Sequence, residues 1–163
     1  MTKIDWLDHL DPNALEWAKQ NAANRIESGP SGEKLNGDQR LRIRATVVDA
    51  LERHHSVRQL AHTLESQFGF NFRQSAVIAH DEMKTALEQG LFYGAKATFE
   101  KVGKQAQKKW LLSNDPGVCG ACAANAAQGW IEMDKPFASG HLAPPGCYGC
   151  RCGAAYQRKP SLK

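Results

Sequence analysis

The sequence PPGCYGCRC spans residues 144–152, and an earlier CGAC spans residues 119–122. Between them they contain all five cysteines of the chain. Each stretch carries a C-x2-C pair, and a gap of two residues lets one tight turn direct two sulfurs at one ion. Zn²⁺ prefers four tetrahedral thiolate or imidazole ligands. The sequence therefore predicts a structural zinc site that organises this part of the fold, with the ligands Cys119, Cys122, Cys147 and Cys150.

Two further side chains leave the ligand set open. Cys152 is an alternative to Cys150, because residues 150 and 152 point to the same side of an extended segment. His141 is a sixth candidate, although a histidine in a loop is more often simply solvated. A redox pair and unpaired buried thiols are the alternatives to a metal. A site with four protein ligands has no open coordination position, so it indicates structure rather than catalysis.

The composition excludes several classes of protein. The chain has 163 residues, 42% of them hydrophobic, which is too many for a wholly disordered chain. No run of about 18 apolar residues occurs, so no membrane span is expected. The five cysteines are odd in number and clustered, which favours a metal site in a reducing compartment over a secreted disulfide framework. A net charge of +4 does not by itself indicate a nucleic-acid partner.

The residues before the cysteines have the spacing of amphipathic helices. Pro12 suits the first position of a helix, and the Gly- and Pro-containing residues 28–32 suit a linker. Ser56 and Gln59 form a capping box, and Gly69 suits the end of the helix that this box opens. The sequence predicts helices over about residues 12–26, 38–54, 57–68 and 72–102.

The second of these helices carries both apolar and basic residues. We place its buried stripe on Leu41, Ala45, Val48 and Leu51. The arginines at positions 40, 42 and 44 spread around the helix, because successive residues are about 100° apart. This spread favours a solvated surface over a phosphate-binding stripe.

The sequence changes character after Gly103. Residues 108–112 suit a strand, residues 121–127 suit one or two helical turns, and residues 152–157 suit a closing strand. We expect the aromatic side chains of Trp110, Trp130 and Phe137 to form the core of this part. The predicted fold is α+β and mainly helical. A helical N-terminal arm (1–70) precedes a domain (71–163) that ends in a small, zinc-stapled, β-containing cap (about 108–157).

A weaker pattern suggests an enzyme. His80-Asp81-Glu82, followed by Pro145 and the pair Cys147 and Cys150, is similar to the H-x-E…P-C-x-x-C signature of zinc-dependent nucleotide deaminases. In that class, the histidine and two cysteines bind zinc, and the glutamate moves protons. Here a glycine separates the proline from the cysteine, and the first C-x2-C pair has no role. A helix surface around His80 and Glu82 is the simpler interpretation.

Several motifs occur in a characteristic order: IAHDE at 78–82, KW at 109–110, C-x2-C at 119–122, PF at 136–137 and PPGCYGCRC at 144–152. In their order and spacing, the residues from about 74 to 157 resemble the phage Mu F-type head-morphogenesis family, the minor head proteins of tailed phages. That family ends in a pattern close to P-P-x-H-P-x-C-R-C, so Cys147 stands where a histidine is usual. This exchange keeps a zinc ligand, and the resemblance favours Cys150 as the fourth.

The resemblance implies a non-enzymatic minor head protein of the virion, located at the portal vertex or in the capsid interior and in the host cytoplasm during assembly. The implied partners are the portal protein, the major capsid protein, or both, and a helical arm would suit such docking. Packaged DNA is a further candidate partner, contacted through the most basic segment of the chain. Its lysines are Lys96, Lys101, Lys104, Lys108 and Lys109. A zinc-containing nucleic-acid-binding regulatory module is the alternative function.

Overall fold

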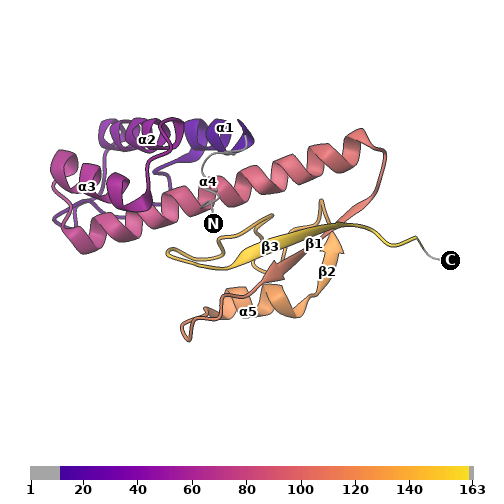
Figure 1. The fold of residues 1–163 in the computed structure, drawn as a ribbon. Coiled ribbons are helices and arrows are strands. Elements are labelled where there is room, and N and C mark those ends of the chain that lie inside the picture. Colours follow the sequence, from indigo (N-terminus) through magenta and orange to yellow (C-terminus); the bar gives the residue numbers. More distant parts are fainter. Residues whose placement is uncertain (1–11, 162–163) are drawn as a thin grey trace, which may run out of the picture. The chain divides into compact units, whose positions relative to one another are not determined.

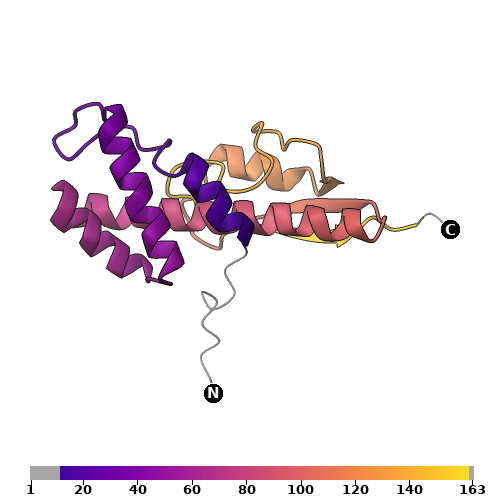
Figure 2. The ribbon, with the colours of Figure 1, turned by 90° about the horizontal axis from the view of Figure 1, so that it is seen from above.

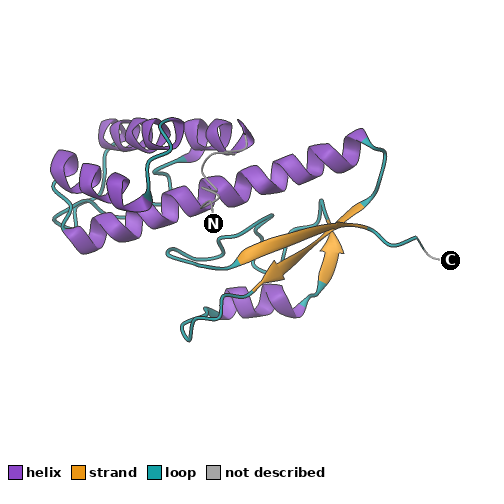
Figure 3. Cartoon of the chain, viewed as in Figure 1, coloured by secondary structure: helices purple, strands orange, loops and turns teal. Residues whose placement is uncertain are grey.

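The computed structural model describes residues 12–161 (Figure 1). The chain divides into two compact units, Met1–Leu87 and Glu88–Lys163. The described residues form five helices and one small antiparallel sheet, so the predicted fold class, mainly helical with a β-containing C-terminal part, is confirmed (Figure 3). The division into an arm and a domain at residue 70 stays a prediction. Within the described residues, none of the helices is long and apolar enough to span a membrane.

The first unit consists of helices whose ends are set by local side chains. They are α1 (Pro12–Asn21), α2 (Gly37–Glu52), α3 (Val57–Phe68) and the N-terminal part of α4 (Phe72–Lys101). Figures 1 and 2 show α2 beside α1 and α3, and all three helices contribute to one apolar core. The predicted capping box of Ser56 and Gln59 is present, and α3 ends at Gly69 with φ +75°. Helices 57–68 and 72–102 are thus confirmed to within a residue or two.

The predicted buried stripe of α2 is right at Leu51 and partly right at Val48, which packs against the core, but it is wrong at Leu41 and Ala45, which are exposed. The residues that α2 buries are Ile43, Val47, Ala50 and Leu51. Leu41 is 60% exposed. Two sets of apolar residues in α2 have helical spacing, and contacts with residues outside the helix decide which set is buried. Arg40 and Arg44 point toward the end of α1, and this orientation turns Ile43 and Val47 into the core.

The predicted extension of the first helix to Ile26 is also wrong, because α1 ends at Asn21. Ala23 has φ +67°, a conformation that a helix does not contain. Its N–H donates to Glu82 Oε2 at 3.0 Å, and its carbonyl oxygen accepts from Arg40 Nη1 at 2.7 Å. Arg44 Nε donates to the carbonyl oxygen of Ala22 at 2.9 Å. The spacing predicted the burial of Ala22 and Ile26 correctly, but the turn between them also depends on hydrogen bonds with the side chains of Glu82, Arg40 and Arg44.

The second unit is built on a sheet with the strand order β2-β1-β3, both pairs antiparallel. Its elements are β1 (Ala106–Leu111), the short helix α5 (Gly120–Ala127), β2 (Trp130–Glu132) and β3 (Gly153–Arg158). The predicted strands around residues 108–112 and 152–157 and the helical turns at 121–127 are confirmed. Strand β2 was not predicted from the sequence, and its three residues are too few to show a clear alternation of polar and apolar side chains.

Two of the three aromatic residues expected in the core are there. Trp110 and Phe137 are buried and meet edge to face, with ring centroids 5.0 Å apart. The prediction for Trp130 is wrong, because this side chain is 38% exposed. Trp130 is the register partner of Lys109, which lies next to Trp110 in β1. Adjacent residues of a strand point to opposite faces, so Trp130 lies on the face away from Trp110.

Lys108 is buried in the same unit and is 0% exposed. Its ammonium nitrogen lies 4.9 Å from the ring centroids of both Phe92 and Phe137. Nζ donates to the carbonyl oxygen of Leu142 at 2.7 Å. Burial lowers the pKa of Lys108 to about 8, an effect that the charge of Asp134 partly offsets. Lys108 therefore connects the sheet to the loop that carries Leu142.

This burial predicts a pH dependence of stability. Because the pKa of Lys108 falls from 10.5 to about 8 on folding, the cost of burying its charge grows as the pH drops through that interval. Lys108→Met keeps the apolar stem and removes the charge. Between pH 10 and pH 8, the wild type should lose about 2 kcal/mol of unfolding free energy relative to this variant. Urea unfolding of both proteins measures this difference, and parallel pH profiles would disprove it.

Candidate metal centre

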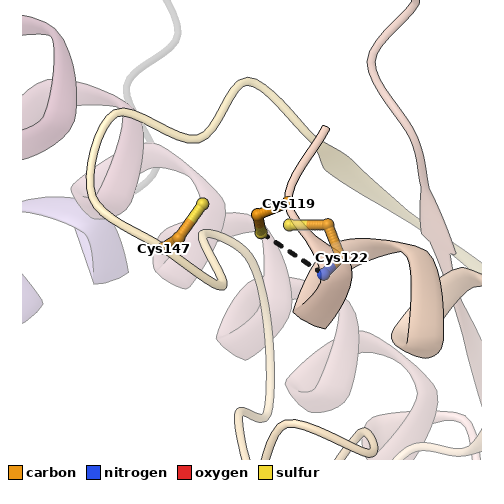
Figure 4. Close-up of side chains that lie close together, drawn as sticks. All are labelled: Cys119, Cys122 and Cys147. Atoms are coloured by element: carbon orange, nitrogen blue, oxygen red, sulfur yellow. Dashed lines mark hydrogen bonds between the residues drawn. The ribbon is translucent and has the colours of Figure 1, made fainter. Parts of the chain in front are cut away.

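The first C-x2-C pair lies at the start of α5. Cys119 is the N-cap residue, with extended backbone angles of φ −71° and ψ 154°. Its sulfur accepts a hydrogen bond from the backbone N–H of Cys122 at 3.4 Å (Figure 4). A capping residue and a residue three positions later lie on the same side of the first helical turn. The helix start therefore brings the sulfurs of Cys119 and Cys122 together.

The second pair lies in a tight turn before β3. The N–H of Cys150 donates to the carbonyl oxygen of Cys147 at 3.2 Å, and Gly149 has φ +73°, which a glycine adopts without strain. The sulfur of Cys150 accepts the N–H of Cys152 at 3.4 Å. Each C-x2-C stretch thus contains a sulfur that receives a backbone amide.

The sulfurs of all five cysteines meet around Cys122. Those of Cys119, Cys122 and Cys147 lie within 4.8 Å of one another, and so do those of Cys122, Cys150 and Cys152. The sulfurs of Cys122 and Cys150 are 3.4 Å apart. Sulfurs bound tetrahedrally to one zinc at about 2.3 Å are about 3.8 Å apart. The cluster can therefore hold a metal ion, and the donor set of thiols suits zinc.

The electrostatics of the cluster are uneven. Hydrogen bonds from Cys147 and from the backbone N–H of Cys122 lower the pKa of Cys119. Burial raises the pKa of Cys122, and it raises that of Cys147 to about 12. At Cys150, burial acts in the same direction, but the N–H groups of Cys152 and Gly146 outweigh it and the pKa is lowered. A divalent cation would supply the charge that ionises the remaining thiols.

Gly146 holds the second stretch close to the first, a role that was not predicted from the sequence. A Cβ atom at this position would lie 3.2 Å from the indole of Trp110 and 3.3 Å from the sulfur of Cys122. Only glycine fits this approach without displacing one of them. The one feature of the sequence that could have indicated this close approach is the presence of a glycine between Pro145 and Cys147.

His141, the sixth candidate ligand, does not belong to the groups of side chains that could hold a metal ion. His141 is exposed, and its Nδ1 is 2.8 Å from the hydroxyl of Ser139. Over residues 12–161, the side-chain groups that could together hold a metal ion consist of cysteines alone. In the deaminase interpretation Glu82 would move protons, but its carboxyl group is buried and accepts the N–H of Ala23.

A family model described as Phage Mu protein F like protein matches residues 41–155, well over half of the chain. The chain belongs to the phage Mu F-like family. The match begins in α2, further toward the N-terminus than the motifs that first indicated it, and it contains both C-x2-C pairs. Comparisons with curated proteins and with solved structures give no match.

Membership of the Mu F-like family indicates a structural phage head protein associated with the virion. It is a family of structural proteins, which agrees with a non-enzymatic role. Both C-x2-C pairs lie within the matched region, so the cysteine cluster belongs to the part of the chain that defines the family.

The five lysines suggested as DNA contacts in this Mu F-like chain differ in their exposure and in their ion pairs. Lys108 cannot present its ammonium to a phosphate because it is buried, which corrects its inclusion in that set. Lys96 pairs with Asp134 and with Glu100. Lys101 and Lys104 are exposed, and Lys109 is half-buried.

Proposed function

We propose that the chain is a minor head protein of a tailed bacteriophage, acting without enzymatic activity in head morphogenesis close to the portal and the packaged DNA. One Zn²⁺ stabilises its C-terminal unit. The observation that carries this proposal is the cluster of five sulfurs around Cys122 within the region matched by the Mu F-like model.

The zinc ligands in this proposal are Cys119, Cys122, Cys147 and Cys150. Three of them already lie within 4.8 Å of one another, and Cys150 is 3.4 Å from the shared sulfur of Cys122. Four thiolates complete a tetrahedral site, so the metal has no position for a substrate. It connects the start of α5 to the turn before β3, whose cysteines pack in one cluster with Trp110 and Phe137.

The partners in this proposal are those that the resemblance to the family implies, and the exposed surface offers places for them. The helical residues before the domain provide a docking surface for the portal protein, the major capsid protein, or both. Among its side chains, Leu41 is 60% exposed although it is large and apolar. Packaged DNA is the third partner, and of the suggested lysines only Lys101, Lys104 and Lys109 remain open to it.

The location in the particle is tested with virions and with assembly intermediates. Mass spectrometry of purified particles should detect the chain, and the portal ring should co-purify with it from lysates of infected cells. Deletion of its gene should reduce the yield of normal heads. If the chain is missing from particles and its deletion leaves assembly unchanged, the proposal is wrong, and a regulatory nucleic-acid-binding role becomes the better account.

A further inference from the structure

The N-terminal end of β1 and the C-terminal end of β3 meet at a hollow of about 420 Å³ in the second unit. The antiparallel register pairs Ala106 with Arg158, and the N–H of Lys159 donates to the carbonyl oxygen of Gln105 at 2.8 Å. This pairing brings Lys104, Arg158 and Lys159 to the rim of one hollow, although more than fifty positions of sequence separate Lys104 from the other two.

The charged lining of this hollow is entirely basic. Its other lining residues are neutral, among them Gly103, Gln105 and Ser161. Within residues 12–161, neither Lys104 nor Arg158 forms an ion pair with a carboxylate, and both are exposed. Lys159 pairs with Glu132 at 3.2 Å, but Glu132 also pairs with Lys135 at 3.2 Å, so one carboxylate serves two lysines.

The acidic residues nearby are already neutralised. A neighbouring hollow of about 330 Å³ shares Lys104 and Lys159 with the first and is lined by three acids, Glu100, Glu132 and Asp134. Three lysines balance these three acids, since Lys96 pairs with both Glu100 and Asp134, and Lys135 and Lys159 both pair with Glu132. The positive charge of Lys104 and Arg158 is therefore left without a local counter-charge.

We propose that Lys104, Arg158 and Lys159 form a binding site for the phosphate backbone of double-stranded DNA. The hollow is several times larger than a single phosphate group and has no enclosed donors, which suits successive phosphates of a polymer better than one free anion. The proposal rests on the proposed function in that packaged DNA supplies the ligand. Two of the three residues lie outside the lysine-rich segment that the sequence had suggested.

The test measures binding of the full-length chain to a fluorescent DNA duplex of arbitrary sequence by anisotropy. The variant Lys104→Gln with Arg158→Gln should bind about tenfold more weakly at about 50 mM salt. Its salt dependence should also be shallower, by about one unit of slope for each phosphate that the variant no longer neutralises. The matched control is Lys34→Gln with Arg58→Gln. It removes the same charge from exposed positions of the first unit and should change binding less than threefold.

Three results would overturn the proposal. The first is that the wild type fails to bind DNA at low salt. The second is that the two double variants weaken binding equally, which would show that DNA is attracted by the overall charge and not by this site. The third is that inorganic phosphate at low millimolar concentration and matched ionic strength displaces the duplex, which would show that the hollow binds single phosphate ions. Circular dichroism of each variant confirms that it is folded. None of these results bears on whether the chain is present in head particles, so the proposed function is tested separately.

Discussion

Cys122→Ser is expected to abolish metal binding and to unfold the C-terminal unit. Cys122 is the one sulfur that belongs to both groups of three in the cluster, and it is buried. Structural zinc contributes about 10–16 kcal/mol to the folding of small metal-dependent domains, which is as large as the usual stability of a whole domain. Zinc analysis of the purified variant, together with amide hydrogen exchange of β1 and β3, measures both effects.

The matched control is Cys152→Ser. Cys152 is as buried as Cys122 and lies in the same cluster, but it belongs to only one of the two groups of three. This variant should keep its zinc. Its free energy of unfolding should fall only by the small amount expected when a buried thiol is replaced by a hydroxyl. Full loss of zinc from Cys152→Ser, together with retention in Cys150→Ser, would show that Cys152 is the fourth ligand. Retention of zinc in Cys122→Ser would refute the proposed site.

In the first unit, Glu82→Gln is expected to stabilise the fold at pH 8 and to have little effect near pH 5. Burial raises the pKa of Glu82 from 4.5 to about 7, against the hydrogen bond from Ala23 and the charges of Arg25 and Arg44. Because the folded state holds this proton more tightly than the unfolded state, protonation of Glu82 adds to the free energy of unfolding. This contribution is complete below pH 4.5 and is lost as the pH rises through 7. Glutamine stays neutral and keeps an oxygen for the N–H of Ala23.

The expected gain at pH 8 is about 3 kcal/mol at most, from a pKa shift of about 2.5 units. Amide hydrogen exchange of α1 and α2, with variant and wild type compared at the same pH, should therefore slow by up to about a hundredfold at pH 8. The control is Glu16→Gln, an exposed position on α1, which should show no such difference. A wild type that is the more stable protein at pH 8 would mean that Glu82 is buried as a paired carboxylate.

The features predicted correctly from the sequence depend on neighbouring residues. Ser56 and Gln59 cap α3, and Gly69 ends it, through contacts within a few positions. The two C-x2-C pairs behave in the same way, because a helix start and a tight turn each fix one pair locally. The sulfurs of the two pairs meet, as the predicted metal site requires.

The features that the sequence did not reveal depend on distant contacts. The buried face of α2 is chosen by Arg40 and Arg44, which bind a turn about twenty positions earlier in the chain. Lys108 is buried because the rings of Phe92 and Phe137 and the carbonyl of Leu142 surround its ammonium group. Composition favours an exposed lysine, and no local pattern marks this exception.

The metal content of the full-length wild-type chain tests the central claim most directly. Elemental analysis of the purified protein should give one zinc per chain. The thiols of Cys119, Cys122, Cys147 and Cys150 should resist alkylation until a chelator is added, and the C-terminal unit should then unfold cooperatively. A folded chain that contains no metal and in which all five cysteines are alkylated without a chelator would contradict the claim.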